Sequence, residues 1–134
     1  MKRSLCALAL AALLVSARQG TVGPLSPKEA LKAFKVADGF QIELVASEPD
    51  VMDPIAMAFD EDGRMYVAEM ADYPLGPPSG RIKVLEDTHG DGKFDRVSTL
   101  VPKIPYPTGV MPWRGGVLVT AAPDIWFQIG RAHV

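Results

Sequence analysis

The sequence predicts an all-β fold, namely a partial β-propeller of about two four-stranded blades preceded by a signal peptide and a short helix. Three observations predict this fold: short segments of alternating polarity, Gly- and Pro-rich turns between them, and an internal repeat. The 134 residues include 12 Gly and 12 Pro, a turn density too high for a helical bundle. A hydrophobic fraction of 48% against 22% charged residues indicates a folded domain rather than a disordered chain.

Residues 1–17 have the three parts of a secretory signal peptide. Met1–Arg3 is cationic, Leu5–Val15 is an uncharged apolar run, and small residues precede a cleavage site after Ala17. The apolar run has about half of the roughly 20 residues that a membrane-spanning helix needs. We therefore expect export to the periplasm, the cell exterior or the cell surface. Cys6 is removed with the signal peptide, which leaves the mature chain without a thiol.

We interpret residues 18–37 as a linker followed by a short helix. Ser26 is a favourable N-cap, and Pro27 is suited to the first helical position. Glu29, three residues after Ser26, completes a capping box. We expect the helix to end before Asp38-Gly39.

Residues 38–127 carry the strand pattern of the predicted blades. Phe40, Ile42, Leu44 and Ala46 alternate with their neighbours, which is the period of a half-buried strand. Further predicted strands are Ile55–Asp60, Met65–Met70, Arg81–Glu86, Arg96–Val101, Thr108–Trp113 and Val117–Ala121.

An internal repeat favours a propeller over a β-sandwich. Pro54–Ala68 can be aligned with Pro107–Ala121 at an offset of 53 residues, and each copy consists of a strand, a tight turn and an apolar strand. A multi-strand repeat a little over about 40 residues long is the size of a propeller blade. Because a ring needs at least about four blades, two would leave strand edges unpaired. We therefore expect the chain on its own to be poorly soluble.

Residues 128–134 match the translation of a common sequencing adapter. The adapter codons ATC GGA AGA GCA CAC GTC encode Ile129–Val134, and the flanking adapter letters complete a codon for Gln128 and supply a stop codon. We therefore expect this segment, including His133, to carry no function and the chain to be the first part of a longer protein.

Several motifs of the chain resemble a family of secreted bacterial propellers. The matching segments are Phe34–Pro49, Asp53–Met70, Gly80–Thr88 and Pro107–Pro123. The family is described as membrane-bound dehydrogenase domains related to glucose/sorbosone dehydrogenases, and the resemblance covers about residues 26–127. Members of this family are long proteins, and a c-type cytochrome module often follows their propeller. The cytochrome motif Cys-x-x-Cys-His does not occur in this sequence.

This resemblance implies an exported dehydrogenase that oxidises a sugar or a related alcohol. In the relatives, pyrroloquinoline quinone (PQQ) at the mouth of the propeller channel takes hydride from the sugar, a histidine acts as base, and calcium helps to hold the quinone. Val67-Ala68-Glu69 matches the relatives' strand–Glu pattern, which implies that Glu69 binds the cofactor. The base has no counterpart here, so the catalytic residues are unknown, and we expect this chain by itself to be inactive. The alternative is a non-catalytic NHL-like propeller that binds carbohydrate or a protein partner.

The segment Asp87–Asp95 is similar to a calcium loop. Asp87, Asp91 and Asp95 fit oxygen-ligand positions 1, 5 and 9 of such a loop, and Lys93 would supply the backbone carbonyl of position 7. Calcium binds several hard oxygen ligands, which these residues provide.

Two residues depart from the calcium-loop pattern. His89 stands at position 3, where an oxygen ligand is usual, and Ser98 replaces the bidentate carboxylate of position 12. The alternative is a hairpin turn in which the aspartates bind their own backbone.

The remaining polar and aromatic residues favour structural roles. We expect Tyr66, Trp113 and Trp126 to pack between blades and Asp60–Asp62 to form a turn. We expect Arg64 and Arg81 to lie at the surface or to reach an anion in the channel. Tyr73 follows a strand in a Pro-rich loop, where functional residues are common. A net charge of −2 excludes a polybasic nucleic-acid binder.

Overall fold

The computed structural model describes residues 23–71, 73–74, 76 and 79–129, in which one short helix and seven strands form. The predicted signal peptide and residues 130–134 lie outside this range, as do most residues of the Pro-rich loop at 75–78. The elements are α1 (Pro27–Ala33), β1 (Pro54–Phe59), β2 (Met65–Glu69), β3 (Gly80–Glu86), β4 (Arg96–Ile104), β5 (Pro107–Trp113), β6 (Gly116–Ala121) and β7 (Asp124–Ile129).

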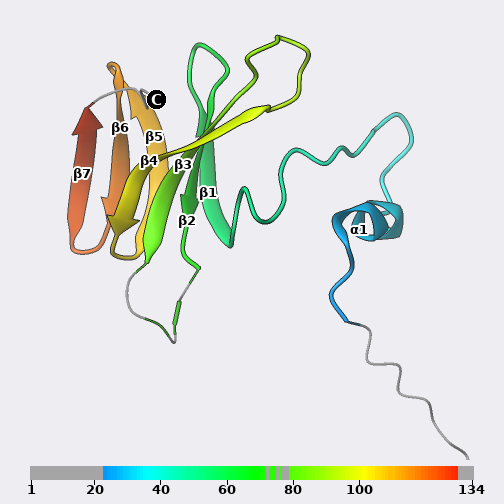
Figure 1. Ribbon diagram of the computed structural model, residues 1–134, viewed down its shortest axis with the longest axis horizontal. Helices are drawn as coiled ribbons and strands as arrows, with labels where there is room; N and C mark the ends of the chain where they lie inside the picture. The colour runs from blue at the N-terminus through cyan, green and yellow to red at the C-terminus, as the bar shows by residue number, and fades with distance from the viewer. Residues whose placement is uncertain (1–22, 72, 75, 77–78, 130–134) are drawn as a thin grey trace, which may run out of the picture.

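The predicted helix forms where its capping residues place it. The Ser26 hydroxyl accepts the backbone N–H of Glu29 at 3.4 Å, and the Glu29 carboxylate accepts the backbone N–H of Ser26 at 2.9 Å. Pro27 occupies the first turn, as expected. No residue of α1 is buried, and the helix lies apart from the two sheets, at the far end of an extended segment (Figure 1). Within the described ranges, no helix is long and apolar enough to cross a membrane.

The strands form two antiparallel sheets, which confirms the prediction of an all-β fold built of partial blades. Sheet 1 has the order β1-β2-β3-β4 and sheet 2 the order β5-β6-β7 (Figure 1). Six of the seven strands agree with the prediction to within three residues at each end. The prediction missed β7, and sheet 2 has three strands in the described part of the chain instead of four.

The internal repeat corresponds to two similar hairpins. The β1–β2 pairing is irregular between Pro54 and Ala56, and the β5–β6 pairing is irregular between Pro107 and Gly109, at the same place in the repeat. The residues before the two prolines, Asp53 and Tyr106, both have positive φ angles, of 43° and 45°. Non-glycine residues rarely adopt this conformation. Its recurrence at an offset of 53 residues therefore supports the repeat at the level of the backbone.

The two hairpins differ in the length of their turns. Phe59 pairs with Met65 across the first turn, whereas the equivalent Pro112 pairs with Val117 across the second. The second turn is thus one residue shorter, and the offset falls from 53 on the first strand of each hairpin to 52 on the second.

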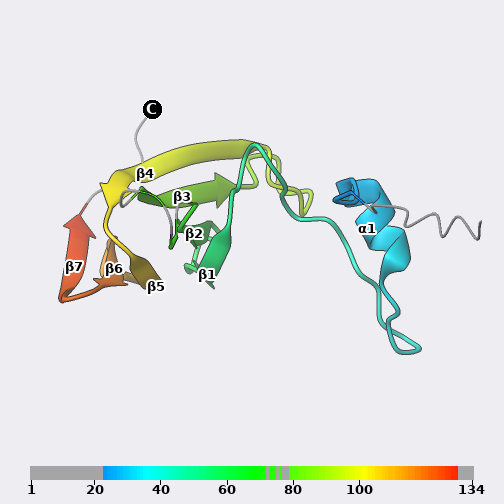
Figure 2. The same cartoon turned by 90° about the horizontal axis from the view of Figure 1, so that it is seen from below.

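The two sheets pack face to face around the main core of the protein. Figure 2 shows the sheets facing each other with β1 next to β5, and these two strands are in contact. The buried side chains of this interface are Tyr66, Ala68, Ile82 and Val84 from sheet 1, Val117, Val119 and Ala121 from sheet 2, and Ile104 from the end of β4.

The two sheets pack front to back, which means that the faces in contact are not equivalent faces of the two repeats. Val117 and Val119 of sheet 2 face the interface. Their repeat equivalents at an offset of 52, Met65 and Val67, lie on the opposite face of sheet 1, in a separate cluster with Leu85. Two sheets related by a twofold axis would instead bring equivalent faces together. Front-to-back packing is the arrangement of successive propeller blades.

The strand predicted over Phe40–Ala46 does not form, which corrects the sequence analysis. These residues have no regular secondary structure, and Phe40, Leu44 and Val45 are exposed. A strand is stabilised by hydrogen bonds and side-chain pairs with a neighbouring strand. This segment has the alternating pattern of a strand, but no described strand pairs with it.

Candidate functional site

The two ends of the sheets carry different kinds of loop. The connection end comprises residues 52–53, the described part of 70–79, and residues 105–106, whereas the turn end comprises residues 60–64, 87–95 and 114–115. Glu69 adjoins the connection end, and the calcium-like segment lies at the turn end. The sequence-predicted cofactor and metal ligands are therefore at opposite ends of sheet 1.

Glu69 is fully buried at the end of β2, and each of its carboxylate oxygens lies next to a polar group of the same chain. Oε1 accepts the backbone N–H of Met52 at 2.8 Å. Nε of Arg81, the cross-strand neighbour of Glu69 on β3, lies 2.9 Å from Oε2 in an ion pair. Nη2 of Arg81 also lies 3.7 Å from Sδ of Met52. The Glu69 carboxylate thus ties the segment that leads into β1 to β2 and β3.

This geometry does not fit Glu69 as a ligand of PQQ. Its side chain is 0% exposed, and its neighbours are a backbone N–H and a guanidinium of the same chain. PQQ carries carboxylates of its own, which a second carboxylate repels. Arg81, with 31% of its side chain exposed, has the opposite charge but already pairs with Glu69. A cofactor role for Glu69 remains a prediction from the resemblance.

Two tyrosines meet at the connection end. The rings of Tyr73, after β2, and Tyr106, before β5, are 6.2 Å apart between centroids and nearly perpendicular. Both side chains are exposed. The sequence analysis had selected Tyr73 but missed Tyr106. The signal for Tyr106 is its place directly before the repeated proline, equivalent to Asp53.

The carboxylate of Asp87 binds the backbone of its own loop. Oδ1 accepts the N–H of Gly90 at 2.7 Å and those of His89 and Asp91 at 3.2 Å, and Oδ2 accepts the N–H of Gly92 at 2.7 Å. These backbone hydrogen bonds, that from Gly92 foremost, lower the pKa of Asp87 below its usual value. Asp87 therefore organises the turn by itself.

The other two aspartates of this segment are also engaged. Asp91 accepts the backbone N–H of Lys93 at 3.0 Å. Asp95 accepts the N–H of Thr88 at 3.2 Å and its hydroxyl at 2.9 Å, and it also contacts Nδ1 of His89. Desolvation raises the pKa of Asp95, but the hydrogen bonds from Thr88 and His89 outweigh it and leave the pKa lowered.

The segment therefore has the geometry of a self-bonded turn, the alternative to a calcium loop. Among the residues that the structure describes, no three His, Cys, Asp or Glu side chains are grouped to hold a metal ion. Calcium would have to displace the four N–H donors of Asp87 before that carboxylate became a ligand. The calcium set of Asp87, Asp91, Lys93 and Asp95 remains a prediction from the sequence.

A buried ionic cluster at the turn end was missed by the sequence analysis. Asp60 has only 3% of its side chain exposed, and Nε of Arg64 lies 2.6 Å from its Oδ2. Asp60 also accepts the backbone N–H of Arg64 at 2.9 Å and the hydroxyl of Tyr66 at 3.1 Å. The Asp60-to-Arg64 spacing across a turn glycine was the available signal. Desolvation raises the pKa of Asp60, but the hydrogen bonds from Arg64 and Tyr66 leave it lowered.

This cluster predicts loss of stability in acid. Because the pKa of Asp60 is lower in the folded chain, its contribution is present above the unfolded-state pKa of about 3.9 and is lost as the pH falls through the folded-state pKa. Replacing Asp60 by Asn should therefore flatten the dependence of unfolding free energy on pH below about 4. Urea unfolding at a series of pH values measures this slope. The control is Asp50→Asn, a change at an exposed turn residue, and equal slopes in the two variants would contradict the assignment.

A comparison with protein-family models finds one match, to a domain of unknown function, DUF7133, over residues 26–132. The chain belongs to the DUF7133 family. The matched region of this DUF7133 domain includes α1, all seven described strands and every candidate residue above. No curated protein and no solved structure matches the chain. The family description assigns no activity, so any function for this DUF7133 domain has to be argued from its residues.

Proposed function

We propose that this domain forms the first blades of an exported quinoprotein-like propeller, in a dehydrogenase that oxidises a sugar or related alcohol. The motif resemblance over residues 26–127 and the succession of two blades support this proposal. In it, the sugar approaches the connection end of the sheets. PQQ, which accepts hydride when bound, and calcium are held by residues outside the two clusters of carboxylates described above. A c-type cytochrome module is the proposed electron-accepting partner.

The observation that carries the proposal is the group of side chains at the connection end. Tyr73 and Tyr106 expose aromatic rings with hydroxyl groups beside the start of β5 in sheet 2. Arg81, on the neighbouring strand β3, has a partly exposed side chain that ends in a guanidinium. Amphipathic rings together with a few fixed polar groups suit a ligand that has both apolar faces and hydroxyls. A sugar is such a ligand.

A non-catalytic propeller that binds carbohydrate or a protein partner is the second candidate. It is favoured by the engagement of Glu69 and Asp87 with donors of their own chain. The one histidine in the described ranges, His89, contacts Asp95 in a turn. Side chains engaged in this way stabilise the fold. A protein that binds a sugar without oxidising it does not need them as cofactor ligands or as a base.

Calorimetric titration with D-glucose and L-sorbosone tests sugar binding. We expect saturable heat, with affinity reduced about tenfold, or about 1.4 kcal/mol, by Tyr73→Ala. Phe40→Ala is the matched control, because Phe40 is an exposed aromatic residue outside the sheets, and it should leave the affinity unchanged. Absence of sugar heat, or equal affinities in the two variants, would refute the proposed site.

A second measurement separates the two candidate functions. A protein that contains the complete propeller is incubated with PQQ, calcium and the sugar that binds, and reduction of an artificial electron-accepting dye is followed. Dye reduction that depends on both sugar and PQQ is the result expected of a dehydrogenase. Sugar binding without dye reduction would reject the dehydrogenase and support the non-catalytic propeller.

Calorimetric titration with calcium alone tests the calcium loop. Heat that is lost in Asp87→Asn would support the calcium loop, and absence of heat would end that prediction.

A further inference from the structure

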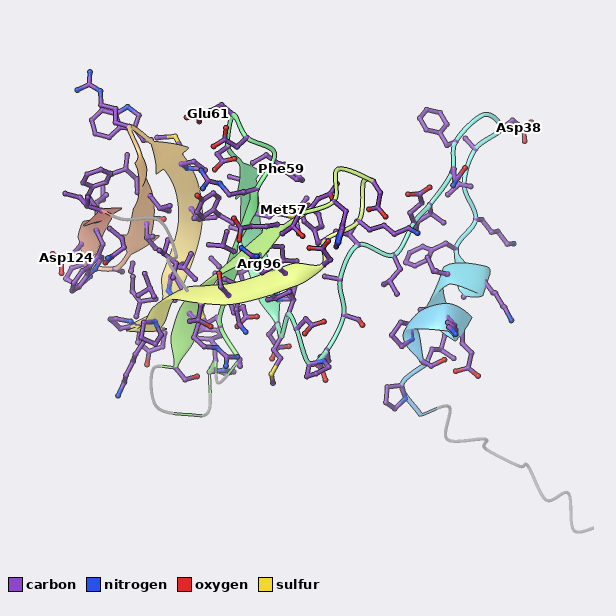
Figure 3. The ribbon with its side chains drawn as sticks, turned by 45° about the horizontal axis from the view of Figure 1, so that its top comes forward. Asp38, Met57, Phe59, Glu61, Arg96 and Asp124 are labelled. Carbon is purple, nitrogen blue, oxygen red and sulfur yellow. The ribbon has the colours of Figure 1, made fainter. Side chains whose placement is uncertain are left out.

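The outer face of sheet 1, on the side away from sheet 2, is an apolar surface that lacks a covering sheet in the described chain. Met57 and Phe59 extend from β1 on this side (Figure 3), and both are exposed, Met57 to 65%. An apolar groove of about 510 Å³ runs along them to the buried Met65 and Val67 of β2. Of the described residues outside the sheet, the irregular segment around Val45–Val51 and Phe94 lie against this face. Exposed apolar surfaces of this kind mark interaction sites.

Sheet 2 has an outer face of the same character. Met111, Leu118 and Phe127 pair across its three strands and therefore share one face. Ile125 lies on the same face, because it alternates with Phe127 along β7, and it is exposed to 73%. This face points away from the core between the sheets.

The internal repeat shows how these two surfaces relate to the interface already present. The face of sheet 2 that packs on sheet 1 is built from Val110, Val117 and Val119. At the repeat offsets its equivalent in sheet 1 is the groove face with Met57, Met65 and Val67. Conversely, Met111 and Leu118 on the outer face of sheet 2 are equivalent to Ala58 and Tyr66, on the packed face of sheet 1. Each uncovered face is thus the repeat counterpart of a face that is covered within the chain.

We propose that the groove face of sheet 1 is a docking surface for the outer face of sheet 2 in a second copy of this chain, in the place that a further blade of the proposed propeller would occupy. The contact would repeat the packing seen between the two sheets of one copy. It joins two different faces, so the association is head-to-tail and continues until a ring closes or a filament grows. Such open-ended association would also explain the poor solubility that is expected from the sequence.

Complementary variants test the head-to-tail contact. Met57→Asp blocks only the groove face, and Ile125→Asp blocks only the outer face of sheet 2. In analytical ultracentrifugation, the unmodified chain should associate as its concentration rises, and each variant alone should be monomeric. An equimolar mixture of the two variants should form a one-to-one dimer, because one intact face remains on each. The double variant should not join either partner. Val36→Asp, at an exposed position outside the sheets, should associate like the unmodified chain.

Three results would overturn the proposal. These are a mixture that remains monomeric, a single variant that self-associates like the unmodified chain, and an unmodified chain that is monomeric at every concentration. The last result would assign the groove to a sheet from another protein segment. Far-UV circular dichroism checks that each variant is folded. If either is not, Phe59→Asp and Met111→Asp repeat the test at neighbouring positions of the same two faces.

Discussion

Replacing Arg81 by Met should lower the free energy of unfolding by about 3 kcal/mol. The change leaves the carboxylate of Glu69 buried without its ion-pair partner, with the N–H of Met52 as its hydrogen-bond donor. Loss of one partner from a buried ion pair costs about 3–5 kcal/mol. We expect the lower end of that range because 31% of the Arg81 side chain is exposed to solvent. Urea unfolding followed by far-UV circular dichroism measures the change.

The matched control for Arg81 is Arg96→Met on β4. Arg96 is 3.8 Å from Glu86 in an ion pair, and 57% of its side chain is exposed. Exposed pairs contribute at most about 1 kcal/mol, so this variant should be close to the parent in stability. Adding Glu69→Gln to Arg81→Met should recover part of the loss, because an amide is cheaper to bury than a charge. Equal effects of Arg81→Met and Arg96→Met would contradict a structural role for the Glu69–Arg81 pair.

Replacing Ile82 by Ala should lower the free energy of unfolding by about 2–5 kcal/mol. Ile82 on β3 is fully buried at the interface between the two sheets. The substitution removes apolar contacts and leaves a cavity between the two sheets, which the surrounding residues fill only in part. The same urea unfolding experiment measures the loss.

Ile42→Ala is the control for the interface. It removes the same atoms from a partly exposed residue outside the sheets, so it should cost much less than Ile82→Ala. If the two substitutions had similar effects, the interface between sheets would not be the main core of the protein.

Local patterns in the sequence were sufficient to predict most elements of the fold. The capping box of Ser26 and Glu29 identified α1 because the interactions that start a helix lie within one turn. The repeat identified both hairpins because their prolines and turn residues recur at a nearly fixed offset. The strand over Phe40–Ala46 was wrong because alternation describes only one side of a pairing. The partner of a strand is a tertiary property that a single segment does not encode.

The candidate site was less accessible to sequence reasoning. Glu69 was selected from a resemblance, but its pairing with Arg81 depends on the register of β2 and β3. Tyr73 and Tyr106 are 33 positions apart in the sequence and meet only because two loops share one end of the sheets. For Asp87, the self-bonded turn had been weighed as an alternative, and the hydrogen bonds agree with that geometry.

The central claim is that the two sheets are successive blades packed front to back. The most direct test is a methyl–methyl nuclear Overhauser measurement on the Met57→Asp/Ile125→Asp chain, in which contacts between copies are blocked. The account predicts cross-peaks from Val117 and Val119 of β6 to Ile82 and Val84 of β3, since all four side chains share one core. Cross-peaks from Val119 to Met65 or Val67 in their place would mean that equivalent faces meet, and would contradict the succession of blades.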